Sequence, residues 1–543
     1  MLAAFLPPYP FRGVRAPYLW LYYRLLTKWA GESAMFITGR EYIRPVEEWN
    51  GRWECAPEMQ SRLGYRLPEH AAIDRHEYQW LDESRFEQWL AAAGHNPIAA
   101  FRYFLTERDN DFEQELRRLL AKASAPVEAL VSICNVPSLE AVCAELGIPV
   151  VHVELGALRA PLFWETSYVD FQGVNGHTES AGRYEAFDKW DLPLARTDLF
   201  QFFARTWRPV PPDAQPDHEL GVVLQVEDDS NLVAFSNGMD NIGLLTVATN
   251  DVAPLGECPL VRAHPGSSFG IRTGRFHVDE SPSSPLFIQR CRRILTINSS
   301  VGLEAVLLDK PVQVFGESSF DFILSASDEA EVISRLAFYL LAYLVPFPLQ
   351  LDPEYLRFRI ARPAEELIIL RHLEKYLELM HLDAKMFAGS PVAERVALSV
   401  LFANQSKTFE EALAKRDGQI SALRQALSEQ DGHTSALTRT LSDREGQIAS
   451  LTQAVLEREG QLSALTHTLS EHVGQIFALA QVVSERDEQF SVMTQAVSER
   501  DERVSALTHA MTERDEKIEA LLSSSSWRMT KAWRFFGRLL RGA

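Results

Sequence analysis

Over about its first 400 residues the chain alternates short apolar runs with amphipathic segments, a pattern that predicts alternating strands and helices. Residues 127–155 contain the strand-like VEALVSIC, the helix-like PSLEAVCAELG and the strand-like IPVVHVEL, in that order. Residues 292–316 repeat the order with RRILTIN, VGLEAVLLD and PVQVFG. The apolar runs GVVLQV (221–226) and LLTVAT (244–249) predict two further strands. Strand–helix–strand units of this kind are typical of parallel α/β sheets.

A segment rich in proline and aspartate, RPVPPDAQPDHE (208–219), separates the two units and indicates a domain boundary. We therefore expect an α/β fold with two Rossmann-like lobes, the first over residues 1–210 and the second over 220–390. Ligands of such folds bind in the crevice at the carboxyl ends of the strands. Polar side chains at the carboxyl ends of the predicted strands are therefore the candidate ligand contacts.

The periodicity changes at about residue 405, where a 14-residue repeat such as REGQLSALTHTLSE begins and runs to residue 522. Apolar residues alternate at spacings of 3 and 4, as at Leu462, Leu465 and Leu469, which is the seam of a coiled coil. Glycines off the seam weaken a single helix by about 1 kcal/mol each. We therefore expect a long α-helical coiled coil over 405–522 that makes the protein a homo-oligomer. A disordered tail is the alternative.

The last segment, residues 523–543, ends in WRMTKAWRFFGRLLRGA, which has five basic residues and no acidic one. On a helix its large apolar side chains fall on one face and its basic side chains on the other. A basic amphipathic helix of this kind is typical of binding to an anionic membrane surface. The alternative is a cationic helix that caps the coil or docks on the acidic body.

The net charge of −20 argues against broad nucleic-acid binding, which needs a basic surface. Five scattered cysteines without a CxxC pair predict a reducing compartment and neither a disulfide framework nor a zinc site. The N-terminal residues lack a secretory signal, and YLWLYYRLL (18–26) is far shorter than the roughly 20 apolar residues of a membrane span. We expect a cytoplasmic protein that is peripheral at the inner face of the plasma membrane.

Two motifs at predicted strand ends could bind an anion. Ser299 and Ser300 precede a predicted helix, where N–H groups and hydroxyls together favour phosphate or carboxylate. Serine also caps helices without any ligand. His264 stands before a proline in VRAHPGSS (261–268), which biases it toward an extended backbone from which it could donate to a phosphate. An isolated His-Pro pair is also common in ordinary loops.

Two other strand ends carry carboxylates. GVVLQVEDDSN (221–231) ends in three consecutive acids, which are unfavourable unless they are solvated or used. Glu154 ends the strand VVHVEL, where burial would raise the pKa of its carboxyl as a general acid requires. A solvated turn and a structural pair of Glu154 with Arg159 are the respective alternatives.

The stretches ELGALRAP, LQVEDDSN, RAHPGSS and INSSVGLEAVLLDKPVQVFG, over roughly residues 125–320, resemble the capsule polysaccharide biosynthesis family. More narrowly, they are similar to its retaining β-Kdo transferases, which are GT-B enzymes related to bacterial sialyltransferases. The resemblance implies a GT-B glycosyltransferase that takes Kdo, an acidic sugar, from CMP-Kdo. It implies no cofactor and no metal besides this donor.

Carried over residue by residue, the resemblance implies a nucleophile at Asp229 and an acid/base at Glu154. The neighbouring Asp228 stays open as an alternative nucleophile. His264, Ser299 and Ser300 would hold the CMP phosphate, and Glu304, one turn along the predicted helix, would meet the ribose hydroxyls. An ordinary helix-surface role is the alternative for Glu304.

The resemblance therefore implies a glycosyltransferase that adds Kdo, with retention, to a lipid-linked bacterial surface polysaccharide such as O-antigen or capsule. Residues 1–120 are expected to complete the first lobe and to face the acceptor. A transferase for another nucleotide sugar is one alternative. The other is a coiled-coil scaffold of a glycan assembly complex with an inactive transferase domain.

Overall fold

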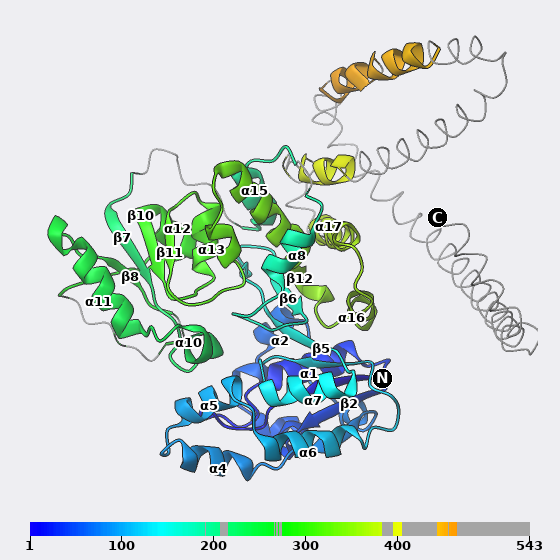
Figure 1. The fold of residues 1–543 in the computed structure, drawn as a ribbon, viewed down its shortest axis with the longest axis vertical. Coiled ribbons are helices and arrows are strands. Elements are labelled where there is room, and N and C mark those ends of the chain that lie inside the picture. Colours follow the sequence, from blue (N-terminus) through cyan, green and yellow to red (C-terminus); the bar gives the residue numbers. More distant parts are fainter. Residues whose placement is uncertain are drawn as a thin grey trace, which may run out of the picture. The chain divides into compact units, whose positions relative to one another are not determined.

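The computed structural model describes residues 1–189, 192–206, 215–264, 266–267, 270, 274–382, 392, 395–403, 443–453 and 455–463. The chain forms two compact units, Met1–Gly418 and Gln419–Ala543. The first unit holds two mixed α/β lobes, each built on its own sheet (Figure 1).

The sheet of the first lobe has seven strands in the order β12-β6-β5-β4-β1-β2-β3. Strands β3, β2, β1, β4 and β5 run parallel, whereas β6 pairs antiparallel with β5 and β12 antiparallel with β6. The strands β1, β2 and β4 are buried along their whole length, as expected of a sheet with helices on both faces. The strands are β1 (Leu2–Phe5), β2 (Ala34–Thr38), β3 (Glu77–Trp80), β4 (Ala129–Ser132), β5 (Val150–Leu155), β6 (Thr166–Asp170) and β12 (Val345–Pro346).

Local signals explain the helices of this lobe. The Asp109 side chain accepts the Phe112 amide hydrogen and so begins α6, whose buried face includes Phe112, Leu116 and Leu119. Helix α7 ends at Gly147, which adopts a left-handed conformation with φ of 69°. The helices are α1 (Leu19–Lys28), α2 (Pro57–Leu63), α3 (His70–Ile73), α4 (Arg85–Ala92), α5 (Pro97–Thr106), α6 (Asn110–Leu120) and α7 (Pro137–Leu146).

The sheet of the second lobe is parallel throughout, in the order β11-β10-β7-β8-β9. The predicted unit over 292–316 is observed as β10, α13 and β11. The strands are β7 (His218–Val223), β8 (Leu260–Arg262), β9 (His277–Val278), β10 (Cys291–Thr296) and β11 (Val312–Val314). The helices are α10 (Ser230–Phe235), α11 (Asn241–Val252), α12 (Ser284–Arg290) and α13 (Val301–Leu307).

The strand predicted over 244–249 is wrong, because this segment lies inside helix α11. Leu244, Leu245, Ala248 and Val252 are buried at helical spacing. The Asp240 side chain begins the helix by accepting the Gly243 amide hydrogen. A short apolar run fits a buried strand and a buried helix equally well, and here the cap and the tertiary packing decide.

After the second sheet the chain returns to the first. Strand β12 lies within the predicted second lobe of 220–390, yet it pairs with β6 and extends the first sheet. The π-helical turn Tyr339–Tyr343 leads into it, and the connecting helices pack in a core with Phe200, Leu340 and Tyr376. These helices are α8 (Ser180–Ala186), α9 (Arg196–Phe203), α14 (Asp321–Leu324), α15 (Glu329–Phe338) and α17 (Glu365–Leu382). Helix α16 (Pro353–Ile360) packs instead in the core of the first lobe through Tyr355 and Leu356.

In the second unit the described residues 443–453 and 455–463 are helical and exposed. The predicted seam residues Ile448, Leu451 and Leu462 expose 59–66% of their surface. The coiled coil over 405–522 stays a prediction, and the tail 523–543 lies outside the described residues. Within the described part of the chain, no helix combines the length and the hydropathy needed to cross a membrane.

Candidate active site

A cleft of about 670 Å³ is lined by residues of both lobes and is called the interlobe cleft here. The structure brings most of the predicted site residues together on its walls. These are Glu154, Asp228, Asp229, His264, Ser299 and Ser300. Glu304 does not line the cleft.

The convergence follows from the topology of the parallel strands. Glu154 is the next-to-last residue of β5, and Asp229 follows β7. His264 comes shortly after β8, and Ser299 comes after β10. The carboxyl ends of parallel strands meet at one edge of a sheet, so these side chains gather at the edge that faces the other lobe.

Glu154 is the carboxyl contributed by the first lobe. Its Oε1 accepts the backbone N–H of Leu155 at 2.7 Å, and protein surrounds the group except where it meets the cleft. Burial, which outweighs the lowering effect of the Leu155 N–H, raises the pKa of Glu154 to about 7. The nearby Asp229 charge raises it further, while the cations Arg159 and Arg12 oppose the rise. A carboxyl poised near neutral pH can both take and give a proton.

The three acids after β7 have three different surroundings. Glu227 Oε1 accepts hydrogen bonds from Asn241 Nδ2 at 3.1 Å and Ser267 Oγ at 2.6 Å. Asp228 forms an ion pair of 3.0 Å with Arg12, which reaches it from the first lobe. Asp229 Oδ1 accepts the Asn231 amide hydrogen at 3.0 Å and so caps α10.

Asp228 and Asp229 therefore differ in the neighbours that engage them. Asp229 acts electrostatically on Glu154, whereas Asp228 is engaged by the Arg12 guanidinium. The capping bond engages Oδ1 of Asp229.

A buried amide network beneath the cleft holds the acidic loop in place. Gln225 Nε2 donates to Asn298 Oδ1 at 2.7 Å, and Asn298 Nδ2 donates to the backbone oxygens of Asn231 and Phe235 in α10. Asn241 closes the network through both backbone groups of Gln225. Gln225 and Asn298 lie in the motifs LQVEDDSN and INSSVG, and the position of Gln225 beside the acids was the available signal for a supporting role.

The two serines differ in what they already bind. Ser299 is buried, and its Oγ accepts the Val301 amide hydrogen at 3.3 Å. Ser300 stands at the N-cap of α13 but makes no side-chain capping bond. The Ser299 hydroxyl therefore already binds a backbone N–H at the start of α13, whereas the Ser300 hydroxyl is available to a ligand in the cleft.

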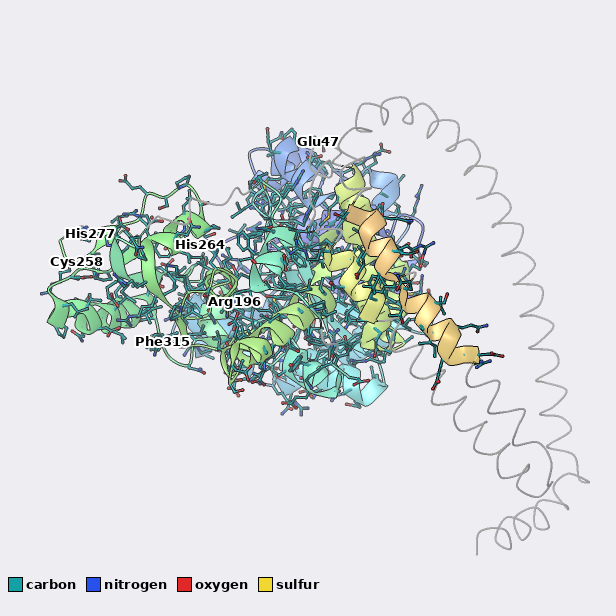
Figure 2. All side chains as sticks on the ribbon, turned by 90° about the horizontal axis from the view of Figure 1, so that it is seen from above. Glu47, Arg196, Cys258, His264, His277 and Phe315 are labelled. Atoms are coloured by element: carbon teal, nitrogen blue, oxygen red, sulfur yellow. The ribbon has the colours of Figure 1, made fainter. Side chains whose placement is uncertain are left out.

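His264 is exposed toward the cleft from the second lobe, where Figure 2 labels it beside the green strands. Its Nδ1 accepts the Gly266 amide hydrogen at 3.0 Å, so a neutral ring carries its proton on Nε2 and can donate it to an anion. Desolvation by the cleft walls, followed by the Arg159 cation, lowers the pKa of His264.

Glu304 departs from its expected position. Its Oε2 accepts a hydrogen bond of 2.5 Å from Ser284 Oγ, and burial raises its pKa to about 7. Ser284, rather than Glu304, lines the cleft. The ribose contact of Glu304 stays a prediction, with Ser284 between its carboxyl and the cleft.

Several cleft residues had no strong sequence signal. Arg12 and Tyr18 reach the cleft from the segment between β1 and α1, and Trp53 exposes 47% of its surface on the first-lobe wall. Arg159 donates to the Gly156 carbonyl at 3.0 Å, and within the described residues it forms no ion pair with Glu154. Among those same residues no three His, Cys, Asp or Glu side chains gather as metal ligands.

Family models match both lobes. Residues 4–179 match the glycosyltransferase 99 family N-terminal domain, and residues 220–332 match the capsule polysaccharide biosynthesis protein model. The first lobe thus matches a glycosyltransferase domain model and the second a capsule polysaccharide biosynthesis domain model. The family resemblance predicted from the motifs and the predicted mixed α/β class are thus confirmed.

Two solved structures of KpsC from Thermosulfurimonas dismutans are similar to part of this chain. The beta Kdo 2,7 transferase is 18% identical with a TM-score of 0.32, over 45% of this chain and 86% of that one. The beta Kdo 2,4 transferase is 16% identical with a TM-score of 0.29, over 42% and 88% of the two chains. No curated protein matches the chain.

Proposed function

We propose that this GT-B-type glycosyltransferase transfers Kdo from CMP-Kdo, with retention, to a bacterial surface polysaccharide such as O-antigen or capsule. One observation carries the proposal: a single cleft is lined by Glu154 from one lobe and by Asp229, His264, Ser299 and Ser300 from the other. Two carboxylates beside phosphate-binding groups are what a double displacement on a nucleotide sugar needs.

In this proposal the CMP phosphate binds at the N-terminal end of α13. The Ser300 hydroxyl and the adjacent backbone N–H groups donate to it, and His264 Nε2 donates to another phosphate oxygen. Arg159, a cation on the cleft wall, offsets the carboxylate of the sugar. These groups stabilise the negative charge that CMP carries away, so the leaving group needs no proton.

The transfer takes two displacements at the anomeric carbon. Asp229 Oδ2 attacks the anomeric carbon while the bond between this carbon and the CMP phosphate oxygen breaks. The products are a covalent Kdo–Asp229 adduct and free CMP. Glu154 then takes the proton of an acceptor hydroxyl, whose oxygen attacks the same carbon and releases Asp229 as a carboxylate. Two inversions give net retention. The pKa of Glu154, about 7, suits a base that works at neutral pH.

The acceptor binds, in this proposal, on the wall that the first lobe contributes. Trp20, Trp53 and Met59 make this wall partly apolar, and Arg52 and Arg62 add cations. An exposed tryptophan on a cleft wall offers a flat apolar surface to a sugar ring. We propose further that the coil makes a homo-oligomer and that the tail holds it at the anionic inner face of the plasma membrane.

The test is CMP release from CMP-Kdo by the full-length protein with a Kdo-accepting glycan. Asp229→Asn removes the nucleophile, and we expect turnover to fall by roughly a thousandfold or more. The matched control, Asp228→Asn, loses only a half-exposed ion pair with Arg12, and we expect roughly a tenfold loss or less. Equal losses in the two variants would reject Asp229 as the nucleophile.

The covalent intermediate gives a second test. Glu154→Gln blocks acceptor activation but not attack by Asp229, so mass spectrometry under donor excess should find Kdo attached to Asp229. An enzyme that binds another nucleotide sugar more tightly than CMP-Kdo in a thermal-shift screen would overturn the donor assignment. A chain that binds no nucleotide would favour the scaffold alternative.

A further inference from the structure

The chain segment after β12 reaches the strand that carries Glu154 through one buried side chain. Gln350 is fully buried, and its Nε2 donates to the Glu154 backbone oxygen at 2.8 Å. Its Oε1 accepts a hydrogen bond from the Arg24 guanidinium of α1. Arg24 can only donate and a carbonyl can only accept, so both partners dictate the same orientation of the Gln350 amide.

Side chains of α1 and of its C-cap residue Trp29 bind the segment 347–351. Arg24 also donates to the Phe347 carbonyl and lies over the Phe347 ring, 3.5 Å from its centroid. Lys28 Nζ donates to the Pro348 oxygen and Trp29 Nε1 to the Leu351 oxygen, each at 2.9 Å. Arg24 is 1% exposed, and within the described residues its guanidinium forms no ion pair with a carboxylate. Burying such a cation is costly, so its contacts with this segment hold the segment at one place.

A single peptide unit links the Gln350 side chain to the Glu154 carboxyl. The carbonyl of the Glu154–Leu155 peptide accepts from Gln350, and the N–H of the same peptide donates to Glu154 Oε1. A peptide unit is planar, so fixing the direction of its C=O also fixes the direction of its N–H. Strand β6 pairs with this position on the sheet side, with Tyr168 opposite Glu154, and Gln350 adds a donor from the returning chain.

We propose that Gln350, held by Arg24, is a positioning residue that orients the Leu155 N–H toward the Glu154 carboxylate and so tunes the base of the transfer reaction. This inference rests on the proposed role of Glu154. The Leu155 N–H stabilises the ionised carboxylate, so its misalignment makes Glu154 harder to ionise. The segment after β12, which joins the first sheet only after the chain has passed through the second lobe, thereby supports a residue far from it in the sequence.

The test compares Gln350→Met and Gln350→Glu with Trp29→Phe. Gln350→Met keeps the volume but removes both hydrogen bonds, whereas Gln350→Glu keeps a partner for Arg24 but places an acceptor against the Glu154 carbonyl. Trp29→Phe removes a hydrogen bond to the same segment without touching Gln350. We expect the acidic limb of the kcat profile to move up by about one pH unit in both Gln350 variants. In Trp29→Phe it should stay in place, and the KM for CMP-Kdo should change less than about twofold in all three.

A second readout does not depend on activity. The difference in Tm between a protein that keeps Glu154 and its Glu154→Gln variant, followed against pH, reports the titration of the Glu154 carboxyl. This difference is measured in the native background and again in the Gln350→Met background. An upward shift of its midpoint with Gln350→Met supports the positioning role even if the donor is not CMP-Kdo. An unshifted midpoint in folded variants overturns it, whereas a native enzyme without a kcat limb near the pKa of about 7 overturns the base role of Glu154 instead.

Discussion

At the scale of single residues, two buried carboxyls with the same raised pKa differ in what they face. Glu154 lines the interlobe cleft, whereas Glu304 is hydrogen-bonded to Ser284 behind the cleft wall. Burial raises the pKa of each to about 7. The cleft and the nearby Asp229, rather than the pKa itself, therefore distinguish the proposed base from its neighbour.

This shared pKa predicts how stability depends on pH. In the unfolded chain both carboxyls ionise near their ordinary pKa of about 4.5, while in the folded protein they keep their protons up to about pH 7. Between these values the folded state binds more protons, so the free energy of unfolding falls as pH rises. Glutamine mimics the protonated form, so Glu154→Gln and Glu304→Gln should each raise stability at about pH 8 by about 1–2 kcal/mol.

Thermal unfolding at about pH 4 and about pH 8 checks this expectation. Each substitution should raise Tm at the higher pH and change it little at the lower one, where the native carboxyls are protonated in both states. Turnover should separate the pair, because Glu154→Gln abolishes it while Glu304→Gln retains it. A Tm gain that is equal at both pH values would contradict the raised pKa.

At the scale of elements, two glycines test how tightly the second sheet is packed. A Cβ on Gly221 in β7 would lie 2.6 Å from Cys291 Sγ, 2.8 Å from Ile294 Cδ1 and 2.9 Å from Phe287 Cζ. Gly221→Ala should therefore destabilise the protein by about 1–3 kcal/mol through overpacking. Gly182, exposed within α8, has nothing within 4 Å, and Gly182→Ala should raise stability by up to about 1 kcal/mol.

Chemical unfolding of the full-length variants measures both effects. The two substitutions add the same methyl group, so opposite signs would show that the packing around β7 decides the outcome. A neutral Gly221→Ala would mean that the side chains around it relax without cost.

The same elements show what sequence patterns can predict. The helix ending at Gly147 and the unit over 292–316 were predictable because proline, glycine and apolar runs mark their limits. The prediction of a strand over 244–249 was wrong because a helix with a buried inner face can carry the same short apolar run as a buried strand. The gathering of Glu154, Asp229, His264 and the serine pair at one cleft was predictable because each lies at or soon after the carboxyl end of a parallel strand.

Residues that contact distant parts of the chain had no such local signal. Arg12 pairs with Asp228, which is 216 positions away, and Gln350 contacts the Glu154 backbone from 196 positions away. A single arginine in a loop or a glutamine after a short strand has no periodicity that points to a distant partner. Only the tertiary packing shows these contacts, the first between the lobes and the second within the first lobe.

At the scale of the whole molecule, the repeat after residue 405 predicts association. The described helical residues 443–453 and 455–463 expose Leu451 and Leu462, which share the predicted seam. Exposed leucines repeated along one stripe are unfavourable in water and are buried when helices pair. We expect the full-length protein to sediment above its monomer mass of 61.4 kDa.

Aspartate on the seam should reverse this association. Leu451→Asp with Leu462→Asp places charges between paired helices, so the sedimenting mass should fall toward 61.4 kDa. Ser450→Asp, on the exposed helix but off the seam, adds a charge without entering the interface and should leave the mass unchanged. CMP release should persist in all variants, because the cleft lies within the first compact unit. A native protein that sediments as a monomer would show that the repeat serves another purpose than self-association.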